Sequence, residues 1–219
     1  MKLLPALLLS ALFAAPAAAA PARADAPCTP ECRSWAELVS VFNEGTDWSV
    51  SVEDRRSSFT VFAPHGGALE PGTSELARVL AGGDWNLYLF ESLRQGRSRR
   101  IHLTSAKYDE PRALELAARS RRAVSVHGSR DAGEKACLGG SSAALRERAA
   151  MGLRAAGFEV EEPCRRLPGK TPANLVNRAR EGGLQLELPR LLLERLAKDA
   201  AAREKFRAAV RSALTDPAP

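Results

Sequence analysis

Short apolar segments and longer amphipathic segments alternate along the chain from about residue 34 onward. The short segments are apolar or alternate between apolar and polar positions, a pattern typical of β-strands. They predict strands at 48–53, 59–63, 86–91, 100–104, 123–126, 158–161 and 184–188. The longer segments carry helix-start and helix-stop residues. They predict helices at 34–42, 74–81, 109–119, 141–156, 171–180 and 190–214.

Strands that alternate with helices in this way favour an α/β fold. We expect a single domain with a largely parallel or mixed central sheet flanked by helices, because 219 residues suffice for one hydrophobic core. In such sheets the chemistry lies at strand ends, where the loops converge. His65, His127 and Glu187 lie at or near the ends of three different predicted strands.

The first 20 residues have the character of a secretory signal peptide. Lys2 precedes an apolar stretch at 3–13, and small residues with A-x-A sites follow it. Cleavage between residues 20 and 26 leaves residues 27–214 as the main domain and 215–219 as a flexible tail. No second long apolar segment follows, so we expect an exported protein, periplasmic or secreted, with no membrane contact once the signal is removed.

Export changes the interpretation of the four cysteines. Cys28, Cys32, Cys137 and Cys164 form an even set, and disulfides persist in oxidising compartments. Three pairings are possible. We favour Cys28–Cys32 with Cys137–Cys164, because the second pair flanks one predicted helix. A cysteine zinc site is disfavoured, since the sequence contains no C-x-x-C pair.

The chain is basic, with a formal net charge of +6 that falls to about +5 when Lys2 leaves with the signal. Such a balance favours anionic partners. The basic runs at 97–100 and 119–122 are most simply the solvated ends of elements, so charge alone does not choose the partner. Export and a total of two tyrosines argue against nucleic acid.

A metal site is indicated by two histidines and a glutamate. The apolar strand at 59–63 leads into a turn that carries His65, and Glu70 precedes the next predicted helix. His127-Gly128 repeats the pattern of a strand followed by histidine and glycine. Zinc hydrolases commonly use two histidines and one carboxylate, and they keep one position open for water. We therefore expect His65, Glu70 and His127 to hold one zinc ion. Alternatively, His65 is a turn residue, Glu70 caps a helix, and His127 is a hydrogen-bonded strand-end histidine.

Glu187 is the candidate catalytic base. It lies within an apolar strand, where a carboxylate is costly unless it has a partner or a function. A carboxylate beside the metal can take a proton from water and pass it to the leaving group.

Arginine binds carboxylates through two hydrogen bonds, which makes it the expected substrate clamp. The first candidate is Arg178, together with its neighbour Asn177, on the helix before the Glu187 strand, and the second is Arg190. Asp109 and Glu110 either orient a ligand histidine or cap a helix. His102 is expected to be structural or to lie just outside the metal ligands.

A family resemblance spans residues 43–198. The segments that carry it are NEGTDW (43–48), APHGGALEPGTSELA (63–77), YLFES (88–92), HLTSAKYDEPRALEL (102–116), SVHG (125–128) and NLVNRAREGGLQLELPR (174–190). Together they resemble the poly-γ-glutamate hydrolase family, whose fold is related to that of zinc carboxypeptidases. The resemblance implies a zinc-dependent amidase that cuts γ-glutamyl amide bonds. It places the ligands at His65, Glu70 and His127 and the base at Glu187.

The chain departs from that pattern in three places: the Cys28–Cys32 segment, the Cys137/Cys164 pair, and Ser142, where the resemblance would place an acidic residue. Two other function classes therefore stay open. One is a zinc carboxypeptidase or deacylase acting on other γ-glutamyl or cell-wall peptides. The other is a non-catalytic binder of acidic polymers. In each case we expect a monomer with an acidic γ-glutamyl polymer or peptide as its partner.

Overall fold

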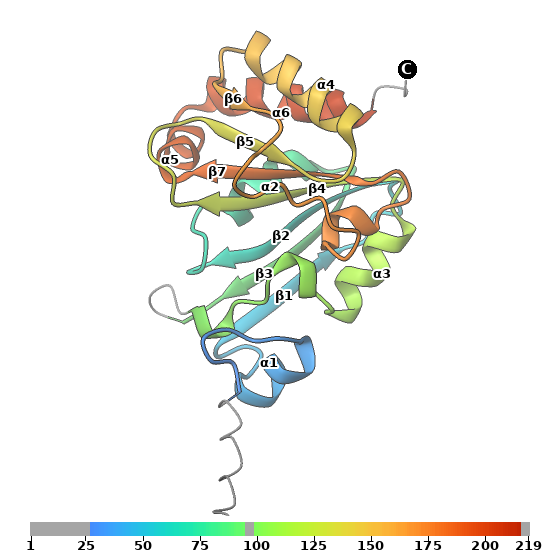
Figure 1. Ribbon diagram of the computed structural model, residues 1–219, viewed down its shortest axis with the longest axis vertical. Helices are drawn as coiled ribbons and strands as arrows, with labels where there is room; N and C mark the ends of the chain where they lie inside the picture. The colour runs from blue at the N-terminus through green and yellow to red at the C-terminus, as the bar shows by residue number, and fades with distance from the viewer. Residues whose placement is uncertain (1–26, 95–98, 216–219) are drawn as a thin grey trace, which may run out of the picture.

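A mixed β-sheet forms the centre of the computed structural model, which describes residues 27–94 and 99–215 (Figure 1). Within these residues the sheet has seven strands, in the order β1-β3-β2-β4-β7-β5-β6. Their bounds are β1 Trp48–Glu53, β2 Phe59–Gly67, β3 Asn86–Ser92, β4 Arg122–Ser129, β5 Ala136–Gly139, β6 Val160–Glu161 and β7 Gly183–Pro189. The four strands β3, β2, β4 and β7 are parallel, whereas β1 and β5 pair antiparallel to their inner neighbours.

Helices cover both faces of the sheet. One face packs against α2 (Thr73–Ala81), α4 (Ala143–Ala155), α5 (Arg190–Lys198) and α6 (Ala200–Thr215). The other packs against α1 (Trp35–Val41), α3 (Pro111–Arg119) and the 3₁₀ helix η3 (Leu175–Arg178). Alternate strand residues supply the two clusters, so Val61 enters the first and Phe62 the second. Figure 1 shows α4 and α6 at the β6 end of the sheet and α1 at the β1 end. The fold is therefore the single-domain α/β architecture expected from the sequence.

Three predicted elements differ from the structure. The strand expected at 100–104 is instead the 3₁₀ helix η1 (Arg99–Ile101), followed by one isolated bridge between Leu103 and Cys32. A second 3₁₀ helix, η2 (Ser105–Lys107), follows it. The helix expected at 171–180 is reduced to η3, which starts only after Asn174, whose side chain accepts a hydrogen bond from the Val176 amide as its cap.

The long helix expected at 190–214 is two helices. It breaks at Asp199, whose carboxylate accepts a hydrogen bond from the Ala202 amide at 2.9 Å. The side chain of Asp199 thus takes the place of a helical bond and starts α6. β5 was not predicted at all.

The favoured cysteine pairing is confirmed, since Cys28 is bonded to Cys32 and Cys137 to Cys164. The predicted signal peptide and residues 216–219 of the predicted tail lie outside the described residues, while Thr215 ends α6. None of the helices in residues 27–94 and 99–215 has the length and apolar character of a membrane span.

Candidate metal centre

The first histidine lies inside a strand rather than in a turn. β2 continues through His65 to Gly67, and its register with β3 shifts between Ala63 and Gly66. A Cβ atom at Gly66 would lie 2.0 Å from Ser74 Oγ, and one at Gly67 would lie 2.4 Å from the Ser92 carbonyl oxygen. The Gly-Gly pair therefore lets β2 pass close to its neighbours and fixes His65 at the irregularity.

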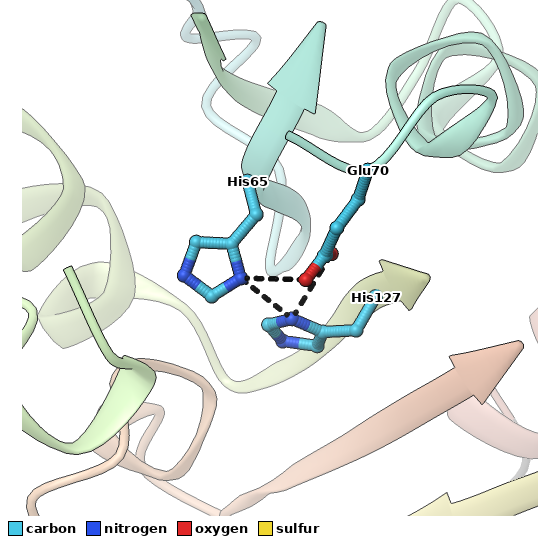
Figure 2. Close-up of side chains that lie close together, drawn as sticks. All are labelled: His65, Glu70 and His127. Atoms are coloured by element: carbon cyan, nitrogen blue, oxygen red, sulfur yellow. Dashed lines mark hydrogen bonds and ion pairs between the residues drawn. The ribbon is translucent and has the colours of Figure 1, made fainter. Parts of the chain in front are cut away.

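Glu70 and His127 approach His65 from two other elements (Figure 2). Glu70 comes from the loop between β2 and α2, and His127 lies near the end of β4, the neighbour of β2. The Gly128 amide donates to Glu70 Oε2 at 2.9 Å, and a Cβ atom at Gly128 would lie 3.1 Å from the Glu70 Cβ. The glycine that follows His127 thus orients the carboxylate and leaves room for it.

The three side chains form a compact triangle of donor atoms. His65 Nδ1 lies 3.1 Å from His127 Nδ1 and 3.2 Å from Glu70 Oε1, and His127 Nδ1 lies 3.6 Å from Glu70 Oε2. Tetrahedral zinc with bonds of about 2.0–2.1 Å puts neighbouring ligand atoms about 3.3 Å apart. The triangle therefore has the size and the chemistry of a His₂Glu zinc site, and these residues can hold the ion.

The far side of each imidazole has a polar neighbour. His65 Nε2 lies 2.9 Å from the Leu103 carbonyl oxygen, and His127 Nε2 lies 3.5 Å from Ser105 Oγ. A carbonyl oxygen can only accept, so the proton of neutral His65 is on Nε2 and its Nδ1 lone pair faces the triangle. Partners of this kind set the tautomer of metal-binding histidines.

Charge within the triangle favours a carboxylate. Burial alone would raise the pKa of Glu70, but the charge and hydrogen bonds of His65 and His127 hold that pKa far below its usual range. Burial opposes protonation of His127, yet the hydrogen bond to Glu70 and the charge of Glu187 raise the pKa of His127. The site therefore attracts positive charge to its centre.

Glu187 lies on β7, directly across from His127 on β4. It is buried, and its Oε1 accepts a hydrogen bond from Gln185 Nε2 at 2.8 Å. Asn174 Nδ2 in turn donates to Gln185 Oε1 at 2.7 Å, so a chain of amides orients the carboxylate. Burial raises the pKa of Glu187 above its usual value, although His127 opposes the shift. A carboxylate with a raised pKa is suited to accept and return a proton.

One cavity of about 480 Å³ contains the whole constellation. His65, Glu70, His127 and Glu187 line it together. Its walls also include segment 99–106 and segment 166–171. Three arginines are among the lining residues: Arg99, Arg130 and Arg166.

Comparison with known proteins agrees with this geometry. Residues 32–214 match the family model described as poly-γ-glutamate hydrolase. The chain belongs to the poly-γ-glutamate hydrolase family. A solved bacteriophage poly-γ-glutamate hydrolase superimposes with a TM-score of 0.76 at 28% identity, covering 83% of this chain and 95% of that one. A zinc-free apo structure of YndL superimposes with a TM-score of 0.75 at 26% identity, covering 84% and 96%.

Curated relatives from Bacillus subtilis (strain 168) are similar over a shorter region. The SPbeta prophage-derived protein YoqZ is 37% identical over 138 residues, which is 62% of this chain and 49% of YoqZ. YndL is 32% identical over 149 residues, 65% of this chain and 58% of YndL. The matched region thus spans about half of these relatives' own length.

The structure does not bring the predicted substrate-binding residues to the cavity. Arg178 is exposed, and its Nε donates to the Ala173 carbonyl oxygen. Asn177 bonds the backbone of Ser141, Gly169 and Thr171. Arg190 pairs with Glu194 on the surface of α5 and lies beside a small separate pocket next to Glu70. All three predictions assumed a helix at 171–180 or proximity in sequence to Glu187.

Asp109 and Glu110 prove to be capping residues. Glu110 accepts from the Ala113 amide at the start of α3, and Asp109 accepts from the Trp35 amide. His102, in contrast, lines the cavity beside the triangle, with its ring 4.2 Å from that of His65. Burial is the main cause that lowers the pKa of His102 to about 3, so the ring is neutral.

Sequence reasoning missed the cavity arginines and the orienting amides of Asn174 and Gln185. Arg99 is part of a basic run that was interpreted as solvated, and Arg130 and Arg166 lie in loops without a motif. Gln185 could have been found, because it is a polar residue two positions before Glu187 on the same strand and therefore on the same face.

Proposed function

We propose that this chain is an exported zinc-dependent amidohydrolase that cleaves γ-glutamyl amide bonds of poly-γ-glutamate. The observation that carries the proposal is the placement of the His65–Glu70–His127 triangle and Glu187 in one cavity. A purely structural zinc site would have no use for a buried carboxylate beside it. The zinc-free form of the similar protein YndL supports zinc as the metal, and the one such triangle among the described residues supports one ion.

The chemistry divides between the metal and the chain. Zinc held there would polarise the scissile carbonyl and lower the pKa of a water molecule to about 7. Glu187 removes a proton from the attacking water and then gives it to the leaving nitrogen. The Asn174–Gln185 amide chain keeps the Glu187 carboxylate in place.

Substrate carboxylates are bound by the arginines of the cavity. Every residue of poly-γ-glutamate has a free carboxylate next to its γ-linked amide. Arg166 is the first candidate clamp, because it lines the cavity together with Glu187 and its charge partly opposes the burial that raises the pKa of Glu187. Arg99 and Arg130 come from two other segments and are suited to neighbouring carboxylates.

Export and the extent of the catalytic domain belong to the same proposal. Two disulfides and the signal-like residues 1–20 support a periplasmic or secreted location, with residues 27–214 as the catalytic domain after cleavage between 20 and 26. We expect the enzyme to act as a monomer.

The test is the chain length of poly-γ-glutamate after incubation with mature protein, with and without a chelator. A rapid fall in polymer length that the chelator abolishes, and that added zinc restores, is the expected result. If the polymer is unchanged although the protein carries one zinc ion, poly-γ-glutamate is not the substrate, while the metal site is retained. In that case short γ-glutamyl peptides and acylated peptides distinguish a carboxypeptidase from a deacylase.

A further inference from the structure

The N-terminal disulfide closes a short, rigid loop next to the metal centre. Cys28 and Cys32 are both buried. The Glu37 carboxylate accepts hydrogen bonds from the Cys28 amide at 3.0 Å and the Arg33 amide at 2.6 Å, so one side chain fastens both ends of the loop. The guanidinium of Arg33 and these amides lower the pKa of Glu37 to about 2, which keeps the fastening carboxylate ionised. Residues 28–32 are therefore held both covalently and by charge.

This loop holds the segment at 100–103. The Cys32 amide donates to the His102 carbonyl oxygen at 3.1 Å, and Glu31 Oε2 lies 3.0 Å from His102 Nδ1. Arg100 Nε donates to the Cys28 carbonyl oxygen at 3.3 Å. A carboxylate oxygen can only accept, so His102 Nδ1 donates to Glu31 in a charge-assisted hydrogen bond.

The same segment holds His65. The Leu103 carbonyl oxygen accepts from His65 Nε2 at 2.9 Å, and the His102 ring packs against the His65 ring. Leu103 belongs to no strand and makes a single β-bridge, to Cys32. The contacts of the disulfide loop thus stand in for the ladder of hydrogen bonds that would fix a strand residue.

We propose that the Cys28–Cys32 loop is a brace for the metal ligand His65, with Glu31 as a positioning residue that acts through His102 and Leu103. The proposal rests on the proposed function, since it assumes that His65 binds zinc. Cys28 and Glu31 precede residue 32, where the match to the family model begins, so the brace adds to the site that the family model covers. It sets the orientation and tautomer of His65 before the metal binds.

The experiment measures the zinc dissociation constant by competition with a chromophoric chelator, on folded, metal-depleted mature protein. In the double variant Cys28→Ser/Cys32→Ser we expect affinity to fall about tenfold or more, the usual effect of losing an outer partner of a metal ligand. Glu31→Ala is also expected to weaken zinc binding, that is, to raise the dissociation constant. Glu31→Gln keeps an acceptor oxygen for His102 Nδ1–H and should recover most of the loss.

Two controls separate the brace from general destabilisation. The double variant Cys137→Ser/Cys164→Ser also removes a disulfide, but Cys137 lies across from Glu187 rather than next to a ligand, so zinc affinity should stay at the wild-type value. Glu204→Ala removes an exposed carboxylate on α6, paired with Arg207, and should change nothing.

The outcomes are distinguishable. If wild-type protein binds no zinc that depends on His65, Glu70 and His127, the proposed function itself fails. If the wild type binds zinc and both brace variants keep its affinity, the brace is wrong. If the double cysteine variant does not fold, the zinc affinities of Glu31→Ala and Glu31→Gln are compared instead. These variants should fold, because Glu31 is partly exposed and outside the hydrophobic clusters.

Discussion

At the scale of single residues, Glu187 is in the most costly position of the site. Its carboxylate is buried beside a second carboxylate, Glu70, and both burial and that charge raise the pKa of Glu187. A leucine at this position would continue the apolar pattern of β7 without such a cost. The cost is explained if the carboxylate moves a proton during the reaction.

Glu187→Gln keeps the shape of the side chain and removes its ability to take a proton. We expect kcat to fall by about 10²–10⁴-fold, the usual contribution of a general base, while zinc affinity stays close to that of the wild type. Steady-state kinetics and zinc titration on the same preparation measure both. Glu204→Gln on α6 is the matched control. Full activity in a zinc-loaded Glu187→Gln variant would discard the mechanism.

The choice between arginines is also a single-residue question. Arg166 lines the cavity and pairs with Asp131 at 2.7 Å, whereas Arg178 is exposed outside it. A hydrogen bond to a charged group contributes about 1.5–3 kcal/mol, and the exposure of Arg166 reduces this. Arg166→Ala should therefore raise KM for poly-γ-glutamate about five- to tenfold with little change in kcat. Arg178→Ala should leave both constants unchanged. If instead Arg178→Ala raises KM and Arg166→Ala does not, Arg178 is the clamp, as the sequence predicted.

At the scale of elements, the irregularity in β2 creates the metal site. Gly66 allows the strand to pass Ser74 and the Phe90 carbonyl oxygen, which a Cβ atom would approach to 2.0 and 2.9 Å. His65 lies within the same irregularity, between Ala63 and Gly66, so a shift of β2 there would move it relative to Glu70. A substitution at Gly66 should therefore affect both the stability of the fold and the binding of the metal.

Gly66→Ala should reduce the free energy of unfolding by about 1–3 kcal/mol, the usual cost of overpacking, and weaken zinc binding as β2 shifts. Gly83→Ala is the control, since a Cβ atom there would meet nothing within 4 Å. Chemical denaturation with and without zinc measures the two effects. Equal stability of the two variants would show that the strand can shift at no cost.

Most elements of this fold could be predicted from local patterns, and the exceptions have physical causes. The apolar runs of β2, β3, β4 and β7 are visible because both of their faces are buried. β5 has only four residues, Ala136–Gly139, in a loop-like context, and its pairing with β7 is decided by tertiary contacts. The helix break at Asp199 could not be predicted, because an aspartate within a long amphipathic stretch equally suits an exposed helical position.

The same division applies to the site. His65, His127 and Glu187 could be predicted, because parallel neighbouring strands bring their ends together. Arg166 could not, because it reaches the cavity on a loop whose course depends on the Cys137–Cys164 disulfide and on the pair with Asp131. Local sequence determines where the strands end, whereas long-range contacts determine where the loops that line the cavity lie.

At the scale of the whole molecule, the basic charge becomes informative once the cavity is known. The chain has a formal net charge of +6, and three arginines line the cavity that contains the proposed metal site. A positive molecule attracts a polyanion over distances beyond direct contact. This attraction depends on salt, since the Debye length falls from about 10 Å at 0.1 M to about 3 Å at 1 M ionic strength.

We therefore expect KM for long poly-γ-glutamate to rise several-fold as sodium chloride increases over this range, with kcat unchanged at saturating polymer. A γ-glutamyl dipeptide carries few charges, so its KM should change much less. Kinetics with both substrates across the salt series measure the difference, and thermal unfolding at each salt concentration controls for stability. A salt-independent KM for the polymer would mean that the basic surface plays no part in binding, and that the contacts within the cavity account for recognition on their own.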